Sequence, residues 1–280
     1  MPRNSVYRIK PNVIYELFKT RKAIIGVIHA RPLPGSPEFQ GSSMQEIYDF
    51  AVDEARKYAL GGVDGLIVEN HGDIPFAKPE DIGPETVAAM TAMADHVRRT
   101  VSLPVGINFL ANAAIPALSV ANASQSKFIR INQWANAYVA NEGIIEGAAA
   151  KATRFRSWIR ANHIKVFADV HVKHGAHAIV GDRSVPELAR DAEFFDADAV
   201  IATGQRTGDA AAIGEVREIA SGTQLPVMVG SGVNIDNIEA LLSVADGAIV
   251  ASSLKEEGVW WTPVSEAKVK EFMITVNKIR

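Results

Sequence analysis

The sequence contains no cysteine, which excludes disulfide bonds, thiolate nucleophiles and thiolate metal sites. The absence of cysteine is typical of a protein that works in a reducing compartment. Residues 1–10 also lack the apolar run and the small-residue cleavage site of a signal peptide. From these two absences we expect a cytoplasmic protein.

Long apolar runs and an excess of basic residues are missing too. No stretch approaches the ~20 apolar residues that a membrane-spanning helix needs, so we expect no membrane span. The formal net charge is −3, which argues against a nucleic acid as the main partner, because phosphate backbones are bound by clustered Lys and Arg. With 48% hydrophobic and 22% charged residues in 280 positions, the composition is that of a globular domain with a large core.

Short apolar segments alternate with amphipathic segments along the whole chain. The apolar segments predict buried strands, and the amphipathic ones predict helices. The expected strands are 23–29, 64–69, 104–108, 127–132, 165–170, 199–202, 226–229 and 247–250. The expected helices are 44–60, 84–100, 114–121, 145–161, 185–195, 210–220, one opening near Ile235, and 265–279.

This strict alternation indicates a parallel sheet that is covered by helices. A strand count near eight favours a single α/β domain over residues 1–280, folded as a (β/α)8 or TIM barrel. An open doubly wound sheet is the alternative, but no Gly-rich turn follows the first strand. The apolar stripe of Val13, Ile14, Leu17 and Phe18 predicts a short N-terminal cap helix at the bottom of the barrel.

Polar residues stand at the ends of the expected strands, where barrels hold their active sites. The loops after the last two strands carry small residues, which let backbone N–H groups approach an anion closely. We therefore predict that a phosphate group binds at Gly230, Ser231, Gly232, Ser252 and Ser253. The alternative is that these glycines only shape turns. The loop 203–208, with Arg206, is a candidate cover for the same ligand.

The fifth expected strand ends in Asp169, His171 and Lys173, which alternate along extended chain and so share one face. We predict that Asp169 is the main catalytic acid or base, that Glu69 is its carboxylate partner, and that His171 and Lys173 stabilise negative charge. His174 and His177 complete a histidine pattern that suggests a metal. However, extended chain places His174 on the opposite face, so no metal site is predicted there.

No cofactor is identified by the sequence. A divalent cation held by the two carboxylates, Glu69 and Asp169, is the one candidate. The partner we expect is a small-molecule substrate, bound by the remaining polar groups at the strand ends and by one aromatic residue: His29, Asn70, Asp73, Asn108, Asn132, Trp134 and Thr203. For His29, fixing the proline-rich loop that follows it is an equal alternative.

With these residues in place, the sequence as a whole resembles the BtpA family, also called the BtpA/SgcQ family. The resemblance runs from Lys22 to the final helix through 25–29, 32–35, 62–70, 72–76, 128–132, 168–174, 203–204, 207–208, 229–233 and 245–250. It implies a ribulose-phosphate-binding type of barrel. The family takes its name from a cyanobacterial protein linked to photosystem I accumulation, and some members carry a nucleosidase label.

Two stretches depart from the family pattern. The family tends to show an Arg and an Asp around the Asn after the third strand, whereas residues 108–113 here carry no charge. A His-Thr-Gly-like turn is common after the fourth strand, but Trp134 stands there in this chain. We therefore expect Phe109 and Trp134 to line the mouth of the barrel, at the ends of its strands, with Trp134 stacking on a ring of the ligand. A packed lid is the alternative role for Trp134.

Three functions follow from these features. The first is an enzyme of carbohydrate or nucleoside metabolism that acts on a phosphorylated sugar or nucleoside-like molecule by acid/base chemistry, as a lyase, isomerase or nucleosidase. The second is a non-catalytic photosystem I biogenesis factor, and the third is a sugar-phosphate sensor. We also expect a homo-oligomer, because such barrels often bury apolar helix faces against a copy of themselves.

Overall fold

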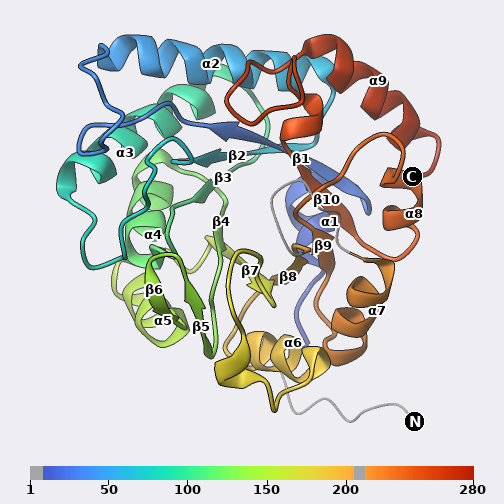
Figure 1. Ribbon diagram of the computed structural model, residues 1–280. Coiled ribbons are helices and arrows are strands. Elements are labelled where there is room, and N and C mark those ends of the chain that lie inside the picture. The colour runs from blue at the N-terminus through green and yellow to red at the C-terminus, as the bar shows by residue number, and fades with distance from the viewer. Residues whose placement is uncertain (1–8, 205–211) are drawn as a thin grey trace.

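The computed structural model describes residues 9–204 and 212–280. Within these ranges, eight parallel strands close into a barrel in the order β1, β2, β3, β4, β7, β8, β9, β10 (Figure 1). Their bounds are Ala23–His29, Gly65–Glu69, Val105–Asn108, Phe128–Ile131, Lys165–Val170, Ala199–Ala202, Val227–Val229 and Gly247–Val250. The predicted (β/α)8 barrel is confirmed, and the open sheet is excluded because β1 pairs with both β2 and β10.

The helices surround the strands (Figure 1). They are α1 Val13–Phe18, α2 Met44–Gly61, α3 Pro84–Thr100, α4 Ala114–Ser124, α5 Ala149–Trp158, α6 Val185–Phe194, α7 Ile213–Gly222, α8 Ile238–Leu242 and α9 Glu266–Asn277, with short 3-10 helices η1 Ala178–Val180 and η2 Ser252–Leu254. Local signals set several starts: Ser43 and Glu46 form a capping box at α2, and Pro84 opens α3. No helix in the described ranges is long and apolar enough to cross a membrane.

A β-hairpin interrupts the predicted pattern after β4. Strands β5, Ala137–Ala140, and β6, Gly143–Glu146, pair antiparallel, so the prediction of one helix over 145–161 was wrong in its first residues. Gly143, at the turn, has a φ of +100°, a conformation that favours glycine. Val139 exchanges backbone hydrogen bonds with Ala176, in the loop after β7. The hairpin is thereby tied to the end of the barrel at which the strands finish.

Helix α1 closes the opposite end, which confirms the predicted cap helix. Asn12 begins it by accepting hydrogen bonds from the N–H groups of the first turn. Val13, Ile14 and Phe18 are buried in the same cluster as the side chains inside the barrel. The Phe18 ring lies edge-on to Phe128, with centroids 5.8 Å apart.

The barrel interior is apolar near α1 and polar at the opposite end, where the strands finish. Val27, Ile67, Phe128 and Phe167 fill the interior layer over α1. Because side chains in a strand alternate between its two faces, the residue two positions further along each strand also points inward. Those residues are His29, Glu69, Arg130 and Asp169. The alternation therefore places four polar side chains, all buried, in a layer next to the apolar layer of the barrel interior.

Candidate active site

A cavity of about 220 Å³ opens at the ends of the last strands, and we call it the corner cavity. It is lined by all five residues predicted to bind phosphate, namely Gly230, Ser231, Gly232, Ser252 and Ser253. These five residues form the small-residue corner. At Gly230 an added Cβ would lie 2.6 Å from Ile201 Cγ2 and 3.3 Å from the Arg130 guanidinium. The absence of a side chain therefore lets Arg130 approach the corner.

A second cavity, of about 380 Å³, lies under the β5–β6 hairpin, and we call it the hairpin cavity. Part of its wall is apolar or aromatic, from Ile74, Pro75, Phe76, Leu110 and Tyr138, and the rest is polar and includes Asn108 and Asn132. Glu69, His71, Arg130 and Lys173 line both cavities, and we call these four residues the shared wall. The charged groups of the site thus stand where the two cavities meet.

Glu69 is held from two sides. Asn108 donates a hydrogen bond to Oε2 at 2.5 Å, and His71 Nδ1 lies 2.9 Å from Oε1 and donates to it. Burial alone would raise the pKa of Glu69, but the hydrogen bond and charge of His71, with the charges of His29 and Arg130, hold it well below its usual range. The carboxylate therefore stays ionised. The Asn108 Oδ1 atom is buried and has no hydrogen-bond partner among the described residues.

His29 lies opposite Glu69 in the corner cavity. Its Nδ1 atom is 3.0 Å from the Trp260 carbonyl oxygen, which can only accept, so Nδ1 carries the hydrogen. Burial, with the nearby charge of His71, lowers the pKa of His29 to about 3. The ring is therefore neutral near pH 7, and it stacks on the His71 ring at a centroid distance of 4.6 Å. His29 lines the corner cavity, and its hydrogen bond goes to Trp260, in the loop after β10, instead of to the proline-rich loop that it was expected to fix.

Asp169 does not reach either large cavity, contrary to its predicted role as the main acid or base. Its side chain has no exposed surface, and Arg130 Nε and Nη2 donate to its two oxygens at 3.0 and 3.1 Å. Asn132 donates a third hydrogen bond at 3.1 Å. The parallel register of β4 and β7 brings these side chains together. Asp169 therefore positions Arg130, which lines both cavities, while Asn132 lines the hairpin cavity.

Lys173, unlike Asp169, lines both cavities. Its ammonium donates to the Ser231 hydroxyl at 3.3 Å, which joins it to the small-residue corner. Burial, and then the charge of Arg130, lower the pKa of Lys173 to about 8, although Glu69 and Asp169 oppose the shift. Thr203, expected to bind substrate, is fully buried, and its hydroxyl accepts from the Lys173 backbone N–H at 2.9 Å. Thr203 therefore fixes the position of the lysine.

The histidines after β7 divide between two pockets, with the His171 and His177 rings in contact at a centroid distance of 4.3 Å. His171 and His177 line a small pocket against α6, and His171 Nδ1 lies 3.5 Å from Glu215, whereas His174 lines the hairpin cavity. A left-handed backbone at His171, with a φ of +53°, ends the alternation that the sequence argument assumed. The predicted catalytic role of His171 is therefore not supported by its position.

Asn70 and Asp73 connect loops instead of facing the cavities. Asn70 accepts from the Leu110 backbone N–H at 2.7 Å and donates to the Leu110 carbonyl at 3.0 Å. Asp73 accepts from the Leu33 N–H at 2.8 Å. Their predicted contact with substrate is replaced by this structural role, because backbone groups of the neighbouring loops use their polar atoms.

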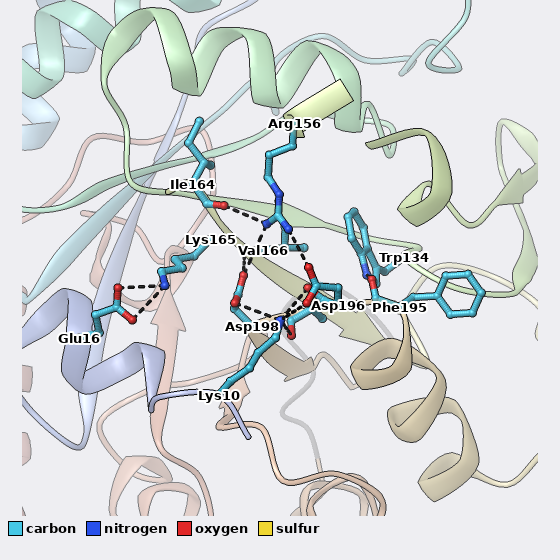
Figure 2. Close-up of polar contacts among 11 residues, drawn as sticks. Lys10, Glu16, Trp134, Arg156, Ile164, Lys165, Val166, Phe195, Asp196 and Asp198 are labelled. Carbon is cyan, nitrogen blue, oxygen red and sulfur yellow. Dashed lines mark hydrogen bonds and ion pairs between the residues drawn. The ribbon is translucent and has the colours of Figure 1, made fainter. Parts of the chain in front are cut away.

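Trp134 and Phe109 lie in the layer between strands and helices, so the prediction that they line the mouth was wrong. Trp134 is 1% exposed and Phe109 is fully buried. The Trp134 indole donates to the Phe195 carbonyl at 2.9 Å, and Figure 2 shows it beside Phe195 and Asp196. A large apolar ring with one N–H group is well suited to this buried position. The packed alternative for Trp134 is the correct one.

Two residues of the shared wall, Arg130 and His71, were not predicted from the sequence. Arg130 stands in the apolar strand Phe128–Ile131, and a charge in such a strand is a signal that it points into the barrel. His71 follows Glu69 by two positions, the spacing that returns a side chain to the same face of extended chain. Arg206, proposed as part of a cover, lies outside the described residues.

A closed parallel barrel with buried charges at its strand ends and a small-residue corner after its last two strands places the chain in the TIM-barrel class. The model of the BtpA family matches residues 20–278. The chain therefore belongs to the BtpA family.

Relatives agree with this membership. An uncharacterized protein of Archaeoglobus fulgidus is 42% identical over 85% of this chain and 93% of the relative. The photosystem I biogenesis protein BtpA of Synechocystis sp. is 37% identical over 93% of this chain and 90% of the relative.

Solved structures agree on the fold. Phosphoribosyl anthranilate isomerase of Thermus thermophilus superposes with a TM-score of 0.56 at 14% identity, over 92% of this chain and all of that chain. The (S)-3-O-geranylgeranylglyceryl phosphate synthase of Thermoplasma acidophilum, in complex with sn-glycerol-1-phosphate, gives a TM-score of 0.58 at 13% identity, over 95% of this chain and 98% of that chain.

Proposed function

We propose that this BtpA-family barrel is an enzyme that acts on a small phosphorylated molecule of the sugar or nucleoside type. The observation that carries the proposal is the shared wall, where a carboxylate, an imidazole, a guanidinium and an amine meet between two cavities. Such convergence of titratable groups in a concave site is typical of an active site.

The phosphate group is assigned to the small-residue corner. Glycine and serine let backbone N–H groups approach an anion, and the loops after the last two strands of TIM barrels commonly bind phosphate. Arg130 and Lys173 add positive charge beside the corner. Arg130 has five N–H groups, and its hydrogen bonds to Asp169 use Nε and Nη2, which leaves Nη1 for an anion. The synthase noted above, a structural neighbour, was solved with a phosphorylated small molecule.

The hairpin cavity holds the rest of the substrate in this proposal. Its apolar and aromatic walls fit a ring or another weakly polar group. The bond that changes then lies at the shared wall, between the phosphate-bearing part and this second part. Such a two-part substrate fits the nucleosidase and lyase classes directly. An isomerase would use the same groups on a single carbon chain.

Charge stabilisation and proton transfer at the shared wall fall to Glu69 and Lys173. Glu69 is ionised, and because its lowered pKa makes it a weak base, it suits the stabilisation of a developing positive charge. Lys173, with its pKa near 8, is close to neutrality and suits proton donation or stabilisation of a developing anion. Positioned acid/base groups typically contribute ~10²–10⁴-fold in rate. Asp169 takes part through Arg130.

A thermal-shift screen with matched pairs of phosphorylated and unphosphorylated sugars and nucleosides tests the proposal. A ligand at 100 times its Kd stabilises the protein by ~2.7 kcal/mol, so only the phosphorylated member of a pair should raise the melting temperature. Ser252→Asp should abolish this shift by placing a negative charge in the corner, while Ser243→Asp, at an exposed position, should not.

Compounds that stabilise the protein are then followed for turnover by mass spectrometry. Turnover that falls ~10²–10⁴-fold in Glu69→Gln, with the thermal shift retained, supports an enzyme. Binding without turnover supports the sensor, and no preference for phosphorylated compounds refutes the proposal.

A further inference from the structure

We propose that His29, Glu69 and His71 bind one divalent transition-metal ion of the zinc class. One ligand atom from each of the three residues lies within 4.8 Å of the others. Within the described residues this is the single cluster of His, Asp and Glu with such spacing. Two imidazoles and one carboxylate are a donor set found in catalytic zinc sites, where a fourth position stays open to water or substrate.

The strongest observation is that two hydrogen-bond acceptors of this cluster face each other. His29 Nδ1 carries its hydrogen to the Trp260 carbonyl at 3.0 Å, so Nε2 of the neutral ring presents a lone pair. That lone pair lies 3.9 Å from Glu69 Oε1, and a carboxylate oxygen only accepts. Among the described residues no donor reaches His29 Nε2. Two acceptors that face each other are stabilised by a cation between them.

The distances are compatible with one ion. Zinc–nitrogen and zinc–oxygen bonds of ~2.0–2.2 Å in a tetrahedron separate the ligand atoms by roughly 3.3–3.6 Å. The observed separations from Glu69 Oε1, 2.9 Å to His71 Nδ1 and 3.9 Å to His29 Nε2, lie on either side of that range. The third separation, between the two imidazole nitrogens, is within 4.8 Å, so binding requires the three side chains to close around the ion. His71 must then carry its hydrogen on Nε2, so that Nδ1 presents a lone pair to the ion.

The surroundings orient the ligands in the way metal sites require. A ligating histidine usually donates its second N–H to a carbonyl or carboxylate, and a ligating carboxylate is itself hydrogen-bonded. His29 meets the first condition through Trp260, and Glu69 meets the second through Asn108. The Trp260 ring packs edge-on to both imidazoles, with centroids 5.9 Å from His29 and 4.5 Å from His71.

An ion at this position faces the corner cavity, which all three ligands line. It would polarise an oxygen of the substrate or lower the pKa of a bound water, beside Lys173 and Arg130. Imidazole and carboxylate donors favour Zn²⁺, Co²⁺, Fe²⁺ or Mn²⁺ over Mg²⁺. Metal binding stands on the ligand geometry and does not depend on the phosphate assignment.

The test is direct metal binding by the full chain, prepared without a histidine tag and stripped with EDTA. Zn²⁺ titrated in a calorimeter should bind at one ion per chain, and Co²⁺ should give the visible absorption of a low-symmetry, four-coordinate site. His71→Ala and Glu69→Gln should each weaken Zn²⁺ binding by at least ~100-fold, while His163→Ala, at an exposed position, should not change it. Circular dichroism checks that each variant is folded.

Absence of 1:1 binding in the wild-type chain overturns the proposal, as does equal affinity in His71→Ala. If His29→Ala fails to fold, His71→Ala and Glu69→Gln still decide, because they remove the other two ligands. Phosphate-dependent thermal shifts measured in EDTA separate the two proposals. Protection by phosphorylated compounds without metal binding refutes the metal site alone, and metal binding without such protection refutes the phosphate assignment alone.

Discussion

Asp169→Asn offers a test of the revised role of Asp169. The substitution keeps the volume and removes the charge that faces Arg130. In the wild-type chain, Arg130 donates to both oxygens of Asp169 at 3.0 and 3.1 Å, and the exposed fractions of the two side chains are 6% and 0%. An asparagine can accept only one of these bonds. The guanidinium charge would then be buried without its partner.

Breaking a buried ion pair by removing one partner costs about 3–5 kcal/mol. For a protein of this size, 1 kcal/mol corresponds to a shift of about 2–4 °C in melting temperature, so we expect Asp169→Asn to melt roughly 6–20 °C lower. Scanning calorimetry at pH 7, with urea unfolding as a second measure, gives both quantities. The double variant Arg130→Met with Asp169→Asn should recover most of the loss, because it leaves no unpaired charge.

Asp95→Asn is the matched control, because Asp95 pairs with Arg98 and Arg99 at the surface of α3. Exposed pairs contribute about 0–1 kcal/mol, so this variant should melt within a few degrees of the wild type. If Asp169→Asn also melts that close to the wild type, the reasoning about the buried pair is refuted. Full stability combined with lost turnover would return Asp169 to the role of acid or base.

Three further outcomes are expected. Burial lowers the pKa of Lys173 in the folded chain to about 8, so its charge destabilises the folded state below pH 8, and this cost decreases as the pH rises toward the ordinary pKa of lysine. Lys173→Met should therefore raise the urea midpoint more at pH 7 than at pH 10. An equal change at the two pH values would contradict the lowered pKa. Trp134→Phe should lose about 1–3 kcal/mol, because the Phe195 carbonyl loses its donor, yet leave phosphate-dependent thermal shifts unchanged; a changed shift would place Trp134 in the site after all. Light scattering at micromolar concentration should give a mass above 30.2 kDa, since Trp158 and Phe194 are exposed apolar residues; a purely monomeric species would reject the proposed homo-oligomer.

The architecture could be predicted from the sequence because it depends on local patterns. Apolar strands such as Ala23–His29 and capped helices such as Met44–Gly61 carry their own signals. The β5–β6 hairpin was missed because its apolar residues at 144 and 145 continue into a helical pattern. Its turn depends on a single glycine, Gly143.

Only part of the site could be predicted, because the sequence shows which polar residues stand at the strand ends but not which side chains they contact. His29 and Glu69 are neighbours by register, and Arg130 meets Asp169 only once β4 is aligned with β7. The register of adjacent strands is a property of the closed barrel, and no local pattern gives it. Similarly, the left-handed backbone at His171 turns that side chain away from the cavities, although the alternation of residues 169–173 suggested otherwise.

The proposed function requires a phosphorylated substrate to bind with its phosphate in the small-residue corner and its reacting carbon at the shared wall. A crystal structure of the protein with a stabilising sugar phosphate would locate both groups. We predict that the phosphate contacts Gly230, Ser231 and Ser252, with the adjacent carbon atoms beside Glu69 and Lys173. A phosphate group bound in the hairpin cavity, or outside both cavities, would contradict the account.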